Sequence, residues 1–271
     1  MQGKHVLITG ATSGIGQAAA KVLKEKGATV IALGRDAGKL EGLRRDLKVE
    51  TIQADLSVQA EVRRAAAEYK QRFARLDVLL NNAGAIFPDR QETKDGHERT
   101  FAVNHLAYFL LTNELLPLLK ASAPARIINV ASDASKAAPV DLNDLENRNF
   151  KSIRAYARSK RMNLLFTFEL ARRLEGTGVT VNALHPGVIK SGFGAGAGLM
   201  GFFVKLAGPF LLTPEQGAQT SIFLASSPDV AGTTGKYFAK SREQRAPEQA
   251  YDPAVQRGLW EASEKLTAPA A

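Results

Sequence analysis

The chain begins with an apolar strand that runs straight into a glycine-rich turn and a helix. His5–Thr9 reads as a buried strand, residues 10–16 as the turn, and the helix continues to Lys26, where Gly27 stops it. A strand that feeds a helix through so short a turn is the first unit of an alternating strand–helix fold, because the helix must return over one face of the sheet. This feature constrains the fold more than any other in the sequence.

The same alternation continues along the chain. Further apolar runs rich in Val, Ile and Leu are separated by helix-like segments, at Thr29–Leu33, Thr51–Ala54, Leu76–Leu80, Arg126–Val130 and Thr180–Leu184. They lack polar alternation, which is typical of parallel strands covered on both faces. We therefore expect an α/β protein, a single-domain Rossmann-like doubly wound parallel sheet with helices on both faces. One domain spans residues 1–271, with a tail at 267–271 that we expect to fray.

Composition excludes several classes of function. The chain has no cysteine, which rules out disulfides and thiolate catalysis, and its 4 histidines lack metal-ligand spacing, so no metal site is expected. No run of about 18 apolar residues exists, so no transmembrane segment is expected. The net charge of +9 is scattered and 7% of residues are aromatic, which argues against nucleic acid as a partner. Residues 4–10 already read as strand and turn, so we expect no targeting peptide and a cytoplasmic protein.

The turn has the sequence Gly10-Ala11-Thr12-Ser13-Gly14-Ile15-Gly16. Its glycines let the backbone approach a pyrophosphate, which would sit on the N-terminus of the following helix. At the end of the second strand, dinucleotide-binding folds place an acidic residue that holds the ribose hydroxyls of NAD. Here Gly34 stands at that position and Arg35 follows, which favours the 2′-phosphate of NADP. The alternatives are a purely structural turn and an exposed loop arginine beside Asp36.

Tyr156 and Lys160 are four positions apart in a segment with helical apolar spacing, so both side chains lie on one helix face. A nearby ammonium favours the phenolate, and a tyrosine whose pKa falls toward neutrality can donate or accept a proton. Such a pair alone arises often by chance. The motifs around this pair favour a catalytic role over a structural one.

Together these motifs resemble the short-chain dehydrogenase/reductase family. They occur in family order between residues 4 and 240, as Thr9-Gly10-x-x-x-Gly14-Ile15-Gly16, Asp55-Leu56, Asn81-Asn82-Ala83-Gly84, Asn104, Ser132, Tyr156-x-x-x-Lys160 and Pro186-Gly187. More narrowly, the chain is similar to the retinol dehydrogenase-like subfamily, in stretches such as Val103-Asn104-His105-Leu106 and His185-Pro186-Gly187-Val188. Residues 141–151, in the long gap between Ser132 and Tyr156, resemble an insertion of that subfamily.

The resemblance implies a role for each matching residue. The catalytic set would be Tyr156 as proton donor or acceptor, Lys160 and Asn104 as its support, and Ser132, preferred to Ser135, as the partner of the substrate oxygen. The cofactor would be NADP, with NADPH preferred over NADH. Its contacts would be Gly10, Thr12, Ser13, Gly14, Ile15, Gly16, Arg35, Asp55, Leu56, Asn82, Ala83, Gly84, Tyr156, Lys160, Pro186, Gly187, Val188 and Ser191. His185 is interpreted as structural rather than as a base.

Residues 192–212 resemble the substrate lid of the family, with a glycine-rich start and an apolar segment from Leu199 to Leu212 that suits closure over an apolar substrate. The alternatives are a core or dimer-packing helix and a weak contact with a membrane surface. We expect an NADP(H)-dependent oxidoreductase that interconverts an apolar aldehyde or ketone and its alcohol. The alternative function is an NADP(H)-binding redox sensor or regulatory protein without turnover. Family habit predicts a homodimer or homotetramer packed through the helices before and including Tyr156.

Overall fold

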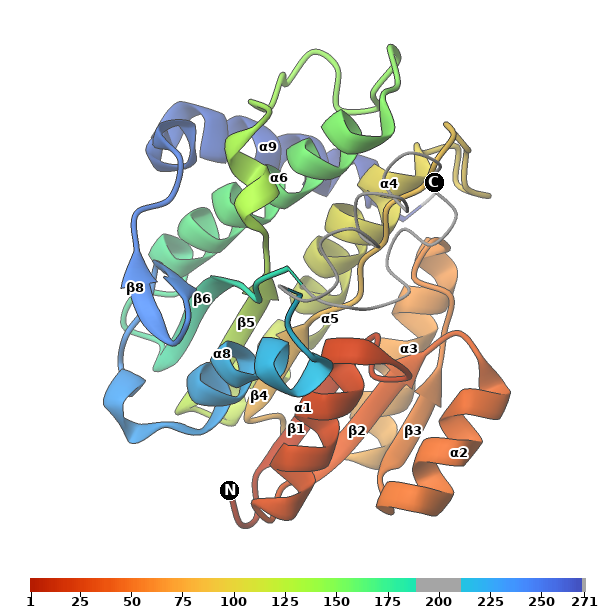
Figure 1. Ribbon diagram of the computed structural model, residues 1–271, viewed down its shortest axis with the longest axis vertical. Coiled ribbons are helices and arrows are strands. Elements are labelled where there is room, and N and C mark those ends of the chain that lie inside the picture. The colour runs from red at the N-terminus through yellow and green to blue at the C-terminus, as the bar shows by residue number, and fades with distance from the viewer. Residues whose placement is uncertain (189–210, 270–271) are drawn as a thin grey trace.

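The computed structural model describes residues 1–188 and 211–269 (Figure 1). Within these ranges eight strands form one sheet in the order β3-β2-β1-β4-β5-β6-β7-β8. β1 to β7 run parallel, and β8 pairs antiparallel with β7 at the edge. The strands are β1 His5–Thr9, β2 Thr29–Gly34, β3 Glu50–Gln53, β4 Val78–Asn81, β5 Ala125–Val130, β6 Val179–His185, β7 Lys236–Ala239 and β8 Arg242–Gln244. The strand order reverses between β1 and β4, which is where doubly wound sheets open a crevice for ligands.

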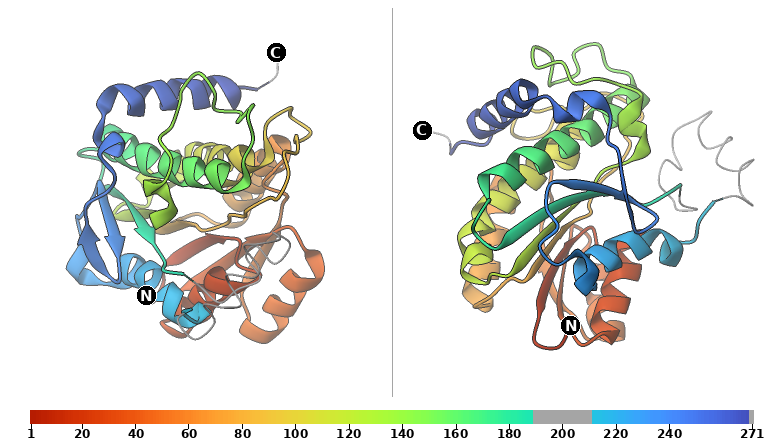
Figure 2. Two further views of the ribbon diagram at one scale, coloured as in Figure 1. Left: turned by 45° about the horizontal axis from the view of Figure 1, so that its top comes forward. Right: turned by 90° about the vertical axis from the view of Figure 1, so that its left-hand side faces the viewer.

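Helices connect the strands and cover both faces of the sheet. They are α1 Gly14–Glu25, α2 Ala37–Leu47, α3 Gln59–Arg72, α4 Arg99–Phe101, α5 Ala107–Ala121, α6 Ser152–Arg173, α8 Pro214–Ser226 and α9 Pro253–Leu266. α1, α2 and α8 pack on one face, and α3, α5 and α6 on the other (Figure 2). The predicted fold class is confirmed. Among the described residues, no helix combines the length and the apolar character needed to cross a bilayer.

The central strands bury both of their faces, which explains their unbroken apolar sequence. Leu7 and Ile127 belong to the core under α3, α5 and α6, whereas the adjacent Ile8 and Ile128 belong to the core under α1 and α8. Successive side chains of a strand point to opposite faces, so each strand serves two cores. β7 and β8 were not predicted as strands, because they are short and all three β8 residues are exposed.

Helix α9 forms an additional layer over α5 and α6 (Figure 2). The Trp260 ring lies 4.9 Å from the Phe109 ring and 5.9 Å from the Phe166 ring, and the Arg173 guanidinium lies 4.1 Å from the Trp260 ring. Helix α9 of the same chain thus covers this part of α6. The packed part of the chain extends past the end of α9. Thr267, which was expected to fray, is 5% exposed, and its hydroxyl donates to the Ser263 carbonyl.

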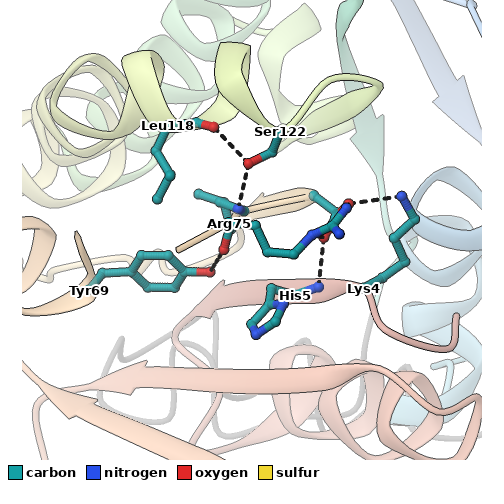
Figure 3. A network of polar contacts seen from close by, with 8 residues as sticks. Lys4, His5, Tyr69, Arg75, Leu118 and Ser122 are labelled. Atoms are coloured by element: carbon teal, nitrogen blue, oxygen red, sulfur yellow. Dashed lines mark hydrogen bonds and ion pairs between the residues drawn. The ribbon is translucent and has the colours of Figure 1, made fainter. Parts of the chain in front are cut away.

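The amino-terminal ends of the central strands hold a structural cluster around Asp77, which precedes β4. Figure 3 shows Lys4, His5 and Arg75 of this cluster. Asp77 is 2% exposed and accepts hydrogen bonds from Lys4 Nζ at 2.8 Å, Arg75 Nε at 2.8 Å and the His5 backbone at 2.9 Å. Burial raises the pKa of Asp77, but the hydrogen bonds and the charges of Arg75 and Lys4 outweigh burial and hold the pKa below its ordinary value. The cluster ties β1 to β4 at the end of the sheet opposite the candidate site.

Candidate active site

A cavity of about 800 Å³ lies at the carboxyl ends of the strands, at the switch point between β1 and β4. Twelve residues expected to contact a cofactor line it: Gly10, Thr12, Ser13, Gly14, Ile15, Gly16, Arg35, Asp55, Leu56, Asn82, Ala83 and Gly84. They come from the turns after β1, β2, β3 and β4. Parallel strands place their carboxyl ends at one edge, which is why residues so far apart in sequence share one cavity.

The glycine-rich turn is held close to the segment after β4. Gly10 has a φ of +66°, and a Cβ built there would lie 2.8 Å from the Ala83 Cα. A Cβ on Gly16 would collide with the Gly10 carbonyl and lie 2.6 Å from Asn82 Nδ2. The Thr9 hydroxyl accepts hydrogen bonds from the backbone N–H groups of both Asn82 and Ala83, each at 2.9 Å. Side chains in place of these glycines would therefore push the turn out of shape.

The N-terminus of α1 opens toward this cavity. Ser13 occupies the N-cap position in an extended conformation, yet its side chain makes no capping hydrogen bond. Helix N-termini carry backbone N–H groups without an intrahelical partner, and the helix dipole adds positive potential there. Ser13, Gly14 and Gly16 all line the cavity. The arrangement fits an anionic ligand such as a pyrophosphate.

The far end of the cavity, after β2, is cationic. Arg35 and Lys39 both line it. The Arg35 side chain is 66% exposed, and its guanidinium lies 3.8 Å from Asp55 Oδ2. Asp36, in contrast, caps α2 by accepting a hydrogen bond from the Lys39 backbone N–H at 2.9 Å. Lys39 was not among the expected residues, because its position two residues inside α2 gives no signal in the sequence.

Asp55 is prepared to act as an acceptor. Its Oδ1 accepts hydrogen bonds from the Ser57 backbone at 2.9 Å and from the Ser57 hydroxyl at 2.8 Å. Burial raises the pKa of Asp55, but these hydrogen bonds and the charges of Arg35 and Arg99 outweigh burial and hold the pKa below its ordinary value. Asp55 is therefore ionised at neutral pH.

A second group of polar residues lies beside the cavity, where α6 crosses the end of β5. Lys160 Nζ donates to the Val130 carbonyl at 2.9 Å and lies 5.7 Å from the centre of the Tyr156 ring. A Cβ on Gly84, which lines the cavity, would lie 3.1 Å from Lys160 Nζ and 3.4 Å from Asn104 Oδ1. The structure thus brings Lys160 and Asn104, two of the expected catalytic residues, to the border of the cavity, with the Tyr156 ring beside Lys160.

Asn104 is placed by a π-helical turn at Ala102–Leu106. Its Oδ1 accepts from the Ala85 backbone at 2.9 Å, and its Nδ2 donates to the Ala85 carbonyl at 2.9 Å and to the Ser159 hydroxyl at 3.0 Å. π-turns are rare and frequently mark functional sites. The insertion of one extra residue turns the Asn104 side chain toward α6 and the segment after β4.

Ser132 follows β5 and faces Tyr156. Its hydroxyl accepts from the Ala134 backbone at 3.1 Å, and its side chain forms a hydrogen bond with Tyr156 that lowers the tyrosine pKa. Ser135, the alternative in the sequence, is fully buried and its hydroxyl finds no partner among the described residues. The structure therefore brings Ser132, and not Ser135, to Tyr156.

Burial controls the protonation of this group. It raises the pKa of Tyr156 to about 12, with the Ser132 hydrogen bond opposing the shift, and it lowers the pKa of Lys160 to about 7. We expected the ammonium of Lys160 to lower the Tyr156 pKa. The protein by itself does the reverse, since a low-dielectric site favours the neutral forms of both side chains.

The expected contacts after β6 lie only partly within the described residues. Pro186, Gly187 and Val188 directly follow β6, and none of the three lines the cavity; Val188 is 63% exposed. The expected contact Ser191 and residues 192–210 of the lid expected at 192–212 lie outside the described residues. The cavity also gains a wall that the sequence did not suggest, in which the Arg99 guanidinium lies 4.4 Å from the centre of the Phe87 ring.

Residues 4–198 match the sequence profile of the short chain dehydrogenase family. The chain belongs to this family. This short-chain dehydrogenase is 44% identical over 288 residues to Retinol dehydrogenase 14 of Mus musculus, and the match covers 98% of this chain and 86% of the relative. It is 41% identical over 279 residues to Retinol dehydrogenase 13 of Homo sapiens, which covers 97% of this chain and 84% of the relative. The predicted likeness to retinol dehydrogenases is confirmed.

Solved structures agree with this assignment. The short-chain dehydrogenase superposes on an uncharacterized protein from Mycobacterium paratuberculosis with a TM-score of 0.81 and 32% identity, covering 98% of this chain and 94% of that chain. It superposes on the RhlG/NADP active-site complex of Pseudomonas aeruginosa with a TM-score of 0.73 and 30% identity, covering 88% and 94%. The protein is therefore an oxidoreductase of alcohol and carbonyl groups, in a family that uses a nicotinamide cofactor.

Proposed function

We propose that the protein is an NADP(H)-dependent oxidoreductase that interconverts an apolar aldehyde or ketone and its alcohol, with Tyr156 as general acid or base. The observation that carries this proposal is the shared border at Gly84. A ligand held at the glycine-rich turn adjoins Lys160 and Asn104, each within 3.4 Å of a Cβ built on Gly84. Cofactor binding and proton transfer thus have adjoining sites.

The cavity fits a dinucleotide. Gly10 and Gly16 leave the backbone accessible where side chains would collide, and the uncapped N-terminus of α1 offers N–H groups to a pyrophosphate. Asp55, held ionised, would accept a hydrogen bond from the adenine amino group. When bound, a nicotinamide cofactor supplies or accepts the hydride, and the protein contributes orientation and electrostatics.

The residues after β2 support NADP over NAD. Recognition of NAD calls for a carboxylate at the position of Gly34, but a Cβ there would lie 2.8 Å from the Thr12 methyl group, which lies in the wall of the same cavity. Arg35 and Lys39 offer two cations to a 2′-phosphate. Asp36 does not compete with them, because its carboxylate caps α2.

Tyr156 is suited to donate a proton. With a pKa of about 12 it is a neutral phenol at physiological pH, the form that protonates the oxygen of a carbonyl during reduction. The Ser132 hydroxyl would hydrogen-bond the same oxygen and thereby orient it. Lys160, held on the Val130 carbonyl at 2.9 Å, would stabilise negative charge that develops on the phenol.

An apolar substrate is supported by two observations. The wall of the cavity after Gly84 is formed by Ile86, Phe87 and Pro88. The relatives at 44% and 41% identity are named for retinol, a lipophilic alcohol. Apolar walls with few polar groups are usual in sites that bind such ligands.

The test is the initial rate of NADPH and NADH oxidation with retinal, long-chain aldehydes and bulky ketones. We expect turnover with NADPH, and a loss of about 10²–10⁴ in rate for Tyr156→Phe, which keeps the ring but removes the proton. The variant should retain NADPH binding, measured by cofactor fluorescence. Unimpaired turnover in Tyr156→Phe would refute the mechanism, and tight NADPH binding without turnover of any carbonyl would favour the redox sensor.

A further inference from the structure

The two loops beside the proposed catalytic residues follow neighbouring strands of the sheet, β5 and β6. Ser132 follows β5, and Pro186–Val188 follow β6. The pairing of β5 with β6 continues just past the end of β5, where the Ala131 N–H donates to the Leu184 carbonyl at 2.8 Å. Beyond that point the two chain segments are joined by a side chain instead of by backbone pairing: the Asp133 N–H donates to His185 Nδ1 at 3.2 Å.

This hydrogen bond specifies how His185 is protonated. The Asp133 N–H is a donor, so Nδ1 must keep its lone pair, and a neutral imidazole then carries its proton on Nε2. His185 Nε2 faces the Asp133 carboxylate, 3.9 Å from Oδ2. The imidazole is mostly buried, with 14% of the side chain exposed. Water therefore does not readily replace the Asp133 N–H if that hydrogen bond is broken.

The Asp133 carboxylate is itself held by two further side chains, one from β7 and one from its own short helix, Asp133–Lys136. The Tyr237 hydroxyl of β7 donates to Oδ1 at 3.0 Å, and Lys136 Nζ lies 2.9 Å from the same atom. The residue that follows Ser132 is therefore tied through His185 to β6 and through Tyr237 to β7. We call this arrangement the His185 clasp.

We propose that His185 is a positioning residue, which holds the Ser132 loop in line with Pro186–Val188 and releases it when the imidazole becomes doubly protonated. The inference rests on the proposed function, in which Ser132 contacts the substrate oxygen. A proton on Nδ1 would point at the Asp133 N–H, so the clasp bond cannot survive protonation. The new cation would instead be drawn to the Asp133 carboxylate.

The charged and titratable groups that face His185, among the described residues, are Asp133, Lys136 and Tyr237. Burial lowers the pKa of His185 below its ordinary 6.5; Asp133 opposes this shift and Lys136 adds to it. Burial and Asp133 raise the pKa of Tyr237, which stays a neutral donor. A lowered pKa favours the neutral ring, so the clasp is closed at neutral pH and opens as the pH falls through the His185 pKa, below 6.5.

Two substitutions separate positioning from bulk packing. In His185→Asn the side-chain Oδ1 takes the place of Nδ1, accepts from the Asp133 N–H and cannot titrate. In His185→Leu the volume is retained and the acceptor is lost. At about pH 8 we expect the Asn variant to keep kcat within about threefold of the native protein and the Leu variant to lose about tenfold or more, because small misplacements of a reacting group are costly.

The pH profile of kcat then tests the protonation step. As the pH falls from about 8 through the His185 pKa, kcat of the native protein should fall relative to kcat of the Asn variant. The ratio of the two kcat values is the readout, because Lys160, whose pKa is about 7, titrates in both proteins. Affinity for NADPH, measured by fluorescence, should differ by less than about threefold among the three proteins, since the glycine-rich turn follows β1 and not β5 or β6. Equal losses in the Asn and Leu variants, or a kcat ratio that does not change with pH, would overturn the proposal.

A measurement without substrate distinguishes failure of the clasp from failure of the proposed function. Nitrogen-15 spectra of the histidine rings should show His185 as the Nε2–H tautomer, identified by its absence in His185→Asn. The ring should titrate below 6.5, and the Asp133 amide should shift with the same midpoint. An Nδ1–H tautomer, or an Asp133 amide that ignores the titration, would refute the clasp even in an active enzyme. If these spectra are as expected and no carbonyl is turned over, the clasp stands and the proposed function fails.

Discussion

Replacement of Arg35 by Glu tests the proposed cofactor preference most directly. Arg35 lies in the wall of the cavity after β2, where its guanidinium is 66% exposed and lies 3.8 Å from Asp55 Oδ2. The backbone of the loop is held separately, because Gln53 Nε2 donates to the Arg35 carbonyl at 3.1 Å. The substitution therefore reverses one charge in the cavity without removing a contact that the loop needs.

The magnitude follows from the exposure of the side chain. A charge-assisted hydrogen bond contributes about 1.5–3 kcal/mol, and solvent screening at an exposed position puts Arg35 at the lower end of that range. This corresponds to about tenfold in affinity for NADPH. Glu adds repulsion toward a 2′-phosphate, for which we assign a second factor of about ten. We expect the NADPH dissociation constant to rise about 100-fold, and that for NADH to change by less than about threefold because NADH lacks the phosphate.

The assay is fluorescence titration of both cofactors at low and high salt. Arg45→Glu is the matched control, because Arg45 is 72% exposed on the neighbouring α2 and lies outside the cavity lining. It makes the same change in net charge, so its effect on either cofactor should be small. Equal weakening of NADPH and NADH in Arg35→Glu, or equal effects of the two substitutions, would refute the assignment of Arg35 to the 2′-phosphate.

Three further predictions concern the glycine-rich turn and two structural contacts elsewhere in the fold. Gly16→Ala should weaken NADPH binding at least about tenfold in the same titration, because its Cβ would collide with the Gly10 carbonyl. Gly42→Ala, in open space on α2, should raise the melting temperature without affecting NADPH binding. Asp77→Asn should cost about 1–3 kcal/mol in urea unfolding at neutral pH. Because the folded pKa of Asp77 lies below its ordinary value of 3.8, the difference from the native protein should begin to shrink near that value and vanish only below the folded pKa; a difference that stays constant would contradict the role of its charge. Trp260→Ala should lower the free energy of unfolding by about 3–5 kcal/mol and the melting temperature by roughly 10 °C. Trp260→Phe should lower both by less, since it keeps an aromatic ring and removes a buried indole N–H that has no partner among the described residues.

The sequence did not predict the protonation states of Tyr156 and Lys160. The spacing of Tyr156 and Lys160 places both on α6, as expected. Spacing cannot report burial, and burial moves the pKa of Tyr156 upward and that of Lys160 downward. The desolvation of a side chain depends on every element packed around it, and here those elements include the end of β5 and the π-turn at Ala102–Leu106.

The burial of α6 shows a similar limit. Apolar residues at helical spacing on α6 predict a buried face, and α6 is in fact buried along most of its length. The pattern does not say what buries it. In the structure Trp260 of α9 fills that place, a contact between residues about a hundred positions apart.

By itself, the sequence determined the central parallel strands and the glycine-rich turn after β1. Strands that bury both faces must be continuously apolar, and a backbone that turns at Gly10 with φ +66° must lack a side chain there, so both leave a local mark. Tertiary structure alone decided which charges meet. The Arg35 guanidinium lies 3.8 Å from Asp55 Oδ2, and His185 Nδ1 accepts from the Asp133 N–H, because parallel strands bring loops that are distant in sequence to one edge of the sheet. The local sequence pattern reflects the conformation that each segment must adopt, whereas contacts between segments that are distant in sequence depend on the whole fold.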